Sequence, residues 1–111
     1  MIYKICPAAE WTQAVERHRY DGSPLDRKDG FIHFSRAPQV AGTLAKYYAD
    51  ASDLVLVAID ETGLEDLRLE PARDGQLFPH LYGTLAMSHV VWVKPLTRSE
   101  DGTFLLPEFG E

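Results

Sequence analysis

The sequence contains a single cysteine, so no disulfide can form within the chain. Cys6 lies in the apolar stretch Ile2–Cys6, where we expect it to be a small core side chain. The N-terminus lacks the basic segment and long apolar core of a signal peptide. No apolar run approaches the ~20 residues that a membrane-spanning helix needs. These absences exclude a disulfide scaffold and predict a cytoplasmic protein with no membrane partner.

Positive charge is also scarce. Eleven basic side chains stand against seventeen acidic ones, which gives a net charge of −6. Such a chain repels phosphate backbones, and no local basic patch interrupts the acidic balance, so general nucleic-acid binding is not expected. The sequence also lacks the GxGxxG, Walker A, GxSxG, HExxH and CxxC patterns. The common dinucleotide, P-loop, esterase and zinc-protease signatures are therefore excluded.

The composition that remains is that of a soluble globular domain, with 45% hydrophobic and 25% charged residues. A length of 111 residues is enough for one hydrophobic core. No repeat or linker divides the chain, and turn signals punctuate it evenly, as at Asp21-Gly22-Ser23-Pro24, Asp29-Gly30, Asp74-Gly75 and Asp101-Gly102. We therefore expect residues 1–111 to form a single domain.

Two helices are expected in the first half of the chain. Apolar residues at helical spacing, among them Trp11 and Val15, predict a helix over residues 8–19. Ser35 offers an N-cap hydroxyl and Pro38 fits a first helical turn, so a second helix is predicted from there to about Ala49.

Strand-like runs occupy most of the remaining chain. Residues 54–59 are apolar on both faces, which predicts a central strand covered on both sides. Further strands are predicted over residues 2–6, 31–34, 64–70, 90–93 and 103–106. Because no regular alternation of strand and helix appears, we predict an α+β fold whose two helices pack on a mostly antiparallel, curved or split sheet.

The first candidate site segment is the predicted strand that contains His33. Side chains alternate along a strand, so Ile32 and Phe34 share the core face while Phe31, His33 and Ser35 share the other. An aromatic, an imidazole and a hydroxyl on one face indicate the wall of a polar pocket. The spacing equally allows a half-buried histidine that bonds to nearby backbone.

The second segment is the run from Leu77 to Gly83. Phe78 precedes Pro79, which favours an extended conformation there. If the backbone stays extended, His80 and Tyr82 share a face. Gly83 then allows a ligand or another backbone to approach closely. Glu70, at the end of an alternating run, adds a carboxylate, although most such glutamates are solvated. A surface turn with a partly packed tyrosine is the alternative interpretation.

These residues resemble a known family. The motifs GFIHFS at residues 30–35 and FPHLYG at residues 78–83, together with Gln39, Glu70 and the strand at 54–60, look like the DUF952 family of small bacterial proteins of unknown function. The resemblance covers the chain from Ile2 to about Leu96.

The resemblance implies an α+β fold related to that of the ADP-ribosyltransferases. In that superfamily a strand-borne histidine holds the nicotinamide ribose, an aromatic ring stacks on nicotinamide, and a glutamate stabilises the charged ribose. Carried over, it implies catalytic roles for His33, Glu70, His80 and Tyr82. It implies ligand binding by His33, Ser35, Tyr82 and Gly83, with NAD or another nucleotide as the ligand.

The sequence leaves four roles open. The site can carry out transfer or glycosidic chemistry, or it can bind a small metabolite or nucleotide without turnover. Two histidines and a carboxylate can also hold a metal ion, although no residue is assigned as a metal ligand. A structural or partner-binding role is the fourth. The residues do not specify the ligand or the oligomeric state.

Overall fold

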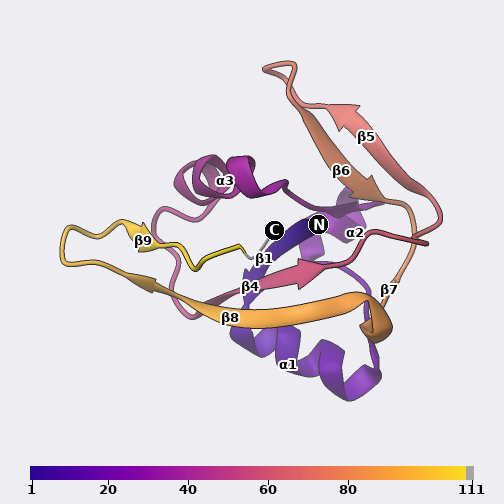
Figure 1. The fold of residues 1–111 in the computed structure, drawn as a ribbon, viewed down its shortest axis with the longest axis horizontal. Helices are drawn as coiled ribbons and strands as arrows, with labels where there is room; N and C mark the ends of the chain where they lie inside the picture. The colour runs from indigo at the N-terminus through magenta and orange to yellow at the C-terminus, as the bar shows by residue number, and fades with distance from the viewer. Residues whose placement is uncertain (110–111) are drawn as a thin grey trace.

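The computed structural model describes residues 1–109 of the chain. Its main sheet is antiparallel and has four strands in the order β1-β4-β8-β9 (Figure 1). The strands are β1 (Ile2–Pro7), β4 (Leu54–Ile59), β8 (Val90–Arg98) and β9 (Phe104–Leu105). The doubly apolar run that predicted a central strand is β4, which pairs with β1 on one side and β8 on the other.

Each face of this sheet is covered by one helix, because β1 and β4 are apolar on both sides. Helix α1 (Ala8–Arg17) packs Trp11 and Ala14 into the cluster that holds Cys6. Helix α3 (Val40–Tyr47), which follows a 3₁₀ turn η1 (Ala37–Gln39), packs Val40 and Leu44 against the opposite face. The buried position predicted for Cys6 is confirmed.

Two smaller antiparallel sheets complete the fold, and they confirm the prediction of a split sheet. One has the order β3-β6-β5, where β5 and β6 form a hairpin that extends away from the main sheet (Figure 1). The other pairs β2 with β7. Their strands are β2 (Arg19–Tyr20), β3 (Ile32–His33), β5 (Leu67–Pro71), β6 (Leu77–Leu81) and β7 (Leu85–Ala86), with the 3₁₀ turn η2 (Met87–His89) after β7.

A third helix, α2 (Pro24–Asp29), lies where the sequence indicated only a turn. The Ser23 side chain accepts a hydrogen bond from the backbone of Asp26, and the Asp26 side chain accepts one from the backbone of Ser23. This reciprocal capping box, with Pro24 at the first helical position, gives the short helix a fixed start.

Several predicted details of the helices are wrong. Helix α1 ends at Arg17 because His18 adopts the left-handed conformation, with φ of 62°. Val15 is half exposed, since Ala14 occupies the core-facing position instead. Ser35 does not cap α3; its Oγ lies 3.2 Å from the Thr43 hydroxyl, and the helix starts at Val40.

The late strands also differ from their predicted limits. β5 begins at Leu67, β8 continues to Arg98, and β9 is reduced to two residues paired with the end of β8. The last part of the predicted 1–111 domain, residues 110–111, lies outside the described residues. Within residues 1–109, none of the helices has the length and apolar character needed to cross a membrane.

Candidate functional site

His33 and His80 face each other on neighbouring strands. The register of β3 and β6 places the two residues directly opposite, and their ring centroids are 5.3 Å apart in an edge-on arrangement. Phe31 joins the pair, because its ring stacks on His80 at 4.1 Å between centroids and also contacts the rings of His33 and Tyr82. The predicted shared face of Phe31 and His33 is thus real, and it meets the predicted face of His80 and Tyr82.

Both ring nitrogens of His33 lie near a carboxylate, but only Nδ1 makes a hydrogen bond to one. Nδ1 lies 2.6 Å from Oδ1 of Asp26, and Nε2 lies 3.1 Å from Oδ2 of Asp29. His33 thus stands between two carboxylates, the buried one of Asp26 and the more exposed one of Asp29.

Asp26 is the centre of a buried polar network and is only 2% exposed. Its Oδ2 accepts hydrogen bonds at 2.8 Å from Lys4 Nζ and from the Ser23 amide, while Oδ1 also accepts from the His33 amide at 3.2 Å. Burial alone would raise the pKa of Asp26, but the hydrogen bond from His33 and the charge of Lys4 outweigh it and hold the pKa well below its usual value. Asp26 is consequently an anion across the physiological range.

Lys4 is the counter-charge of Asp26 and is itself buried. It stands in the middle of β1, among apolar neighbours, and its Nζ also donates to the backbone carbonyl of His33 at 3.0 Å. One ammonium group therefore ties the first strand to α2 and β3.

His80 is held by a different carboxylate. Its Nδ1 lies 2.9 Å from Oε1 of Glu70, and the Tyr82 hydroxyl donates to the same oxygen at 2.6 Å. Hydrogen bonds from Tyr82 and then His80 lower the pKa of Glu70, and the bond to Glu70 raises the pKa of Tyr82. Across residues 1–109, the structure shows no hydrogen bond or ion pair at Nε2 of His80. In the tautomer in which Nδ1 carries the proton and donates a hydrogen bond to Glu70, Nε2 has a free lone pair.

A cavity of about 890 Å³ lies beside the two histidines, and both help to line it. Its wall comes from β1, α2, β3, α3 and the β5–β6 hairpin, and its charged lining residues are Lys4, Asp26, Asp29, Lys46, Arg73 and Asp74. Ser35 lies on this wall, whereas Glu70 and Tyr82 do not. The two carboxylate-held histidines thus present their rings to one hollow from neighbouring strands.

The structure brings most of the sequence-predicted residues together. His33, Glu70, His80 and Tyr82 form one connected cluster. Ser35 shares the cavity but bonds to Thr43. Gly83 is exposed and stands outside both the cluster and the cavity wall.

Three residues of the site escaped the sequence analysis. Asp26 and Lys4 were not considered, and Phe31 was placed on the right face but given no role. Two signals were available: Ser23-Pro24-Leu25-Asp26 has the spacing of a capping box, and a lone lysine in a buried apolar strand requires an acidic partner. No trio of histidine, cysteine or acidic side chains within residues 1–109 is arranged to hold a metal ion.

Comparison with known proteins supports the resemblance seen in the sequence. A family model described as "Protein of unknown function (DUF952)" matches residues 5–93. No curated protein matches the chain. The crystal structure of protein CC0527 from Caulobacter crescentus has a TM-score of 0.88 at 42% identity, covering 94% of this chain and 92% of that one. The solution NMR structure of CC0527 has a TM-score of 0.82 at 43% identity, covering 92% and 89%.

Proposed function

We propose that this chain, which belongs to the DUF952 family of proteins of unknown function, binds a small nucleotide-like ligand in the large cavity and carries out acid–base chemistry on it. The observation that carries the proposal is His80, whose Nδ1 is fixed by Glu70 while Nε2 has no partner beside a cavity of about 890 Å³. A histidine oriented in this way is a competent general base.

The cavity suits a nucleotide in size and chemistry. Pockets for small ligands are usually about 300–1,000 Å³ and combine apolar or aromatic walls with a few polar groups. Here Phe78 and Tyr47 supply aromatic surface for a base, and Lys46 and Arg73 supply cations for a phosphate. Lys46 and Tyr47 come from α3, with Lys46 Nζ 5.2 Å from the centre of the Tyr47 ring, and Arg73 and Phe78 come from the β5–β6 hairpin, so each of these two elements offers one cation and one aromatic ring.

The two histidines have different roles in this proposal. His80 accepts a proton at Nε2, whereas His33, held between two carboxylates, forms a fixed part of the wall of the same cavity. For a substrate such as NAD, a hydroxyl would attack the ribose carbon and give its proton to His80. The electron pair of the broken carbon–nitrogen bond would leave with the nicotinamide.

Glu70 acts as a positioning residue in this proposal. Its Oε1 is occupied by His80 and Tyr82, and the side chain does not line the cavity. The resemblance implied instead that this carboxylate stabilises the charged ribose. Asp29 is a carboxylate that does line the cavity, and it stands beside His33 Nε2.

A second candidate function, ligand binding without turnover, is favoured by the saturation of the His33 half of the site. Asp26 and both nitrogens of His33 already have partners within the protein. A group with no free donor or acceptor contributes shape and charge to a pocket rather than proton transfer.

The test is an NMR titration with NAD⁺, ADP-ribose and AMP, followed by mass spectrometry for released nicotinamide. The variant is His80→Gln, and the matched control is His89→Gln, since His89 bonds the backbone of Asp60 away from the cavity. We expect saturable shifts around residues 33 and 80, and a loss of turnover of about 10²-fold or more in His80→Gln only.

Each outcome decides between the candidates. Binding without nicotinamide release supports the non-catalytic function, provided that AMP incubated with the protein is also recovered chemically unchanged. Failure of all three nucleotides to shift any cavity residue overturns the nucleotide proposal. Equal turnover in His80→Gln and wild type overturns the role of His80.

A further inference from the structure

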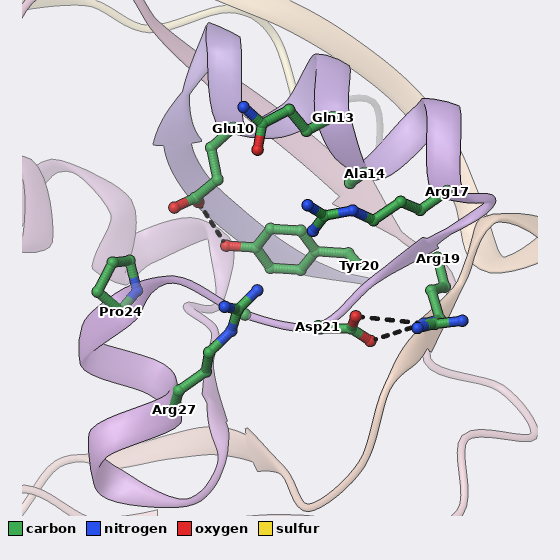
Figure 2. Close-up of a pocket in the computed structure, with 10 residues that line it drawn as sticks. Glu10, Gln13, Ala14, Arg17, Arg19, Tyr20, Asp21, Pro24 and Arg27 are labelled. Atoms are coloured by element: carbon green, nitrogen blue, oxygen red, sulfur yellow. Dashed lines mark hydrogen bonds and ion pairs between the residues drawn. The ribbon is translucent and has the colours of Figure 1, made fainter.

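A second, smaller cavity of about 170 Å³ lies between α1 and α2, on residues to which the proposed function gives no role (Figure 2). Three arginines, Arg17, Arg19 and Arg27, stand against two carboxylates in its lining. This local excess of positive charge contrasts with the net charge of −6 of the whole chain.

The three arginines are not equivalent. Arg19 is engaged, because its Nε lies 3.1 and 3.2 Å from the two carboxylate oxygens of Asp21. The guanidinium groups of Arg17 and Arg27 make no hydrogen bond, ion pair or ring contact within residues 1–109. Figure 2 shows their side chains extending towards Tyr20, Arg17 from α1 and Arg27 from α2. Two guanidinium groups without protein acceptors thus converge on one hollow.

Glu10, the second carboxylate in the lining, already accepts a hydrogen bond within the protein. The Tyr20 hydroxyl donates to Oε2 of Glu10 at 2.8 Å. Burial, followed by the charges nearby, raises the pKa of Tyr20, so the phenol keeps its proton and continues to donate. With Glu10 held by Tyr20 and Asp21 by Arg19, neither acid is bonded to the two free arginines.

Helix ends explain part of this arrangement. Arg17 and Arg27 each lie in the last turn of a helix, where a cation interacts favourably with the helix dipole. That effect accounts for a positive charge at each helix end. It does not account for two side chains from different helices lining the same cavity.

We propose that this cavity binds a small oxyanion, a phosphate group in inorganic form or on a small ester, between the guanidinium groups of Arg17 and Arg27. Guanidinium is the side chain best suited to pair with phosphate oxygens through two parallel hydrogen bonds. The cavity volume of about 170 Å³ admits such a group but not a nucleotide. The acidic surface elsewhere selects against long polyanions.

The two cavities are on opposite sides of α2. Leu25, Asp26 and Asp29 line the large cavity, whereas Pro24 and Arg27 line the small one. A ligand in either cavity should therefore shift different residues, so failure of one proposal is distinguishable from failure of the other.

The experiment is an NMR titration with inorganic phosphate at constant ionic strength, with chloride as the balancing anion. The probes are the Nε–H signals of Arg17 and Arg27. We expect saturable shifts of both, and a loss of affinity of about tenfold or more in Arg17→Gln and in Arg27→Gln. The matched control is Arg68→Gln. Arg68 lies on β5, away from the small cavity, with its guanidinium 4.9 Å from the Tyr82 ring. Its replacement should leave phosphate affinity unchanged.

Parallel titrations with glycerol phosphate and with succinate separate the sources of the anion. A tighter fit for glycerol phosphate identifies an ester, equal or weaker binding identifies free phosphate, and preference for succinate overturns the phosphate class. Shifts that are linear, or that chloride reproduces, overturn the site as mere screening. The wild-type arginine signals decide the question even if a variant folds poorly.

Discussion

The carboxylates of the two histidine–carboxylate pairs have opposite surroundings and define a buried and an exposed pair, although the His33 ring is the more exposed of the two rings, at 33% against 13% for His80. His33 pairs with Asp26, which is 2% exposed and also holds the buried ammonium of Lys4. His80 pairs with Glu70, whose side chain is 34% exposed and whose other partner is the Tyr82 hydroxyl. The rings of the two histidines are only 5.3 Å apart between centroids.

The difference separates a pair that holds the fold from a pair that is available for chemistry. In the buried pair both ring nitrogens of the histidine lie near a carboxylate, and the network joins β1, α2 and β3. In the exposed pair one nitrogen is held and the other is left open beside the cavity. Removing a carboxylate should therefore affect stability in the first pair and ring orientation in the second.

The largest effect is expected for Asp26→Asn. The substitution leaves the Lys4 ammonium buried without a counter-charge, and breaking a buried ion pair in this way costs about 3–5 kcal/mol. Urea unfolding monitored by circular dichroism measures the change. A loss below about 1 kcal/mol would contradict the role given to this pair.

A double-mutant cycle with Lys4→Met sharpens the same comparison. Lys4→Met alone leaves the Asp26 carboxylate without the ammonium group that pairs with it, while the double variant removes both charges. We expect the double variant to be less destabilised than the sum of the two single variants, because neither charge is then stranded. Simple additivity would show that the two groups do not interact.

The next effect is a dependence on acid. Because the pKa of Asp26 is lower in the folded than in the unfolded chain, the stability that it contributes is present above about pH 4 and is lost as the pH falls below that value. Asp26→Asn should flatten the acid limb of the stability curve by up to about 1.4 kcal/mol per pH unit. Glu70→Gln serves as the matched variant from the exposed pair. Identical acid limbs for wild type and Asp26→Asn would contradict the assignment.

A smaller effect is expected for Glu70→Gln, and it concerns orientation more than stability. A carboxylate only accepts, whereas the amide can present either its carbonyl oxygen or its NH2 group to Nδ1 of His80, so the ring should populate both neutral tautomers. Ring ¹⁵N chemical shifts report the change, with the shifts of His33 as the internal control. If the His80 signals stay as in wild type, Glu70 does not position the ring.

The smallest effect is expected for Tyr82→Phe. The hydroxyl is one of two donors to Glu70, and the substitution leaves the bond from His80 in place. Ligand affinity should stay close to that of wild type, while the Glu70 pKa, followed by carboxyl ¹³C shifts, should rise toward its usual value because the Tyr82 bond is the main cause of its lowering. A Glu70 pKa that does not move would contradict this order of causes.

The main sheet and the two aromatic segments were predictable from the sequence because their signals are local. The doubly apolar run at residues 54–59 specifies a central strand, and alternation around His33 specifies which side chains share a face. Alternation also placed His80 with Tyr82. That His80 and Tyr82 lie in one site with His33 was expected from the family resemblance, since no local pattern shows that β3 pairs with β6.

The buried network was not predicted because its parts are far apart along the chain. Lys4, Asp26 and His33 come from three elements, and only tertiary packing brings them into contact. Ser23-Pro24 was interpreted as a turn because Asp21-Gly22 precedes it, although the same residues also start a helix. The position of Val15 was wrong for a simpler reason, since helical spacing allows several adjacent stripes to face the core.

The pairing of β1 with β4 sets an order of events during synthesis. Cys6 pairs with Val55, so the first strand leaves the ribosome with about fifty residues still to come before its neighbour exists. At about 5–20 residues per second this delay is of the order of several seconds. Throughout it, an apolar segment of high strand propensity is exposed, and such segments aggregate. Lys4 places a charge in the middle of this apolar stretch, and a charge at such a position opposes aggregation as long as the chain is unfolded; in the folded protein Asp26 neutralises it.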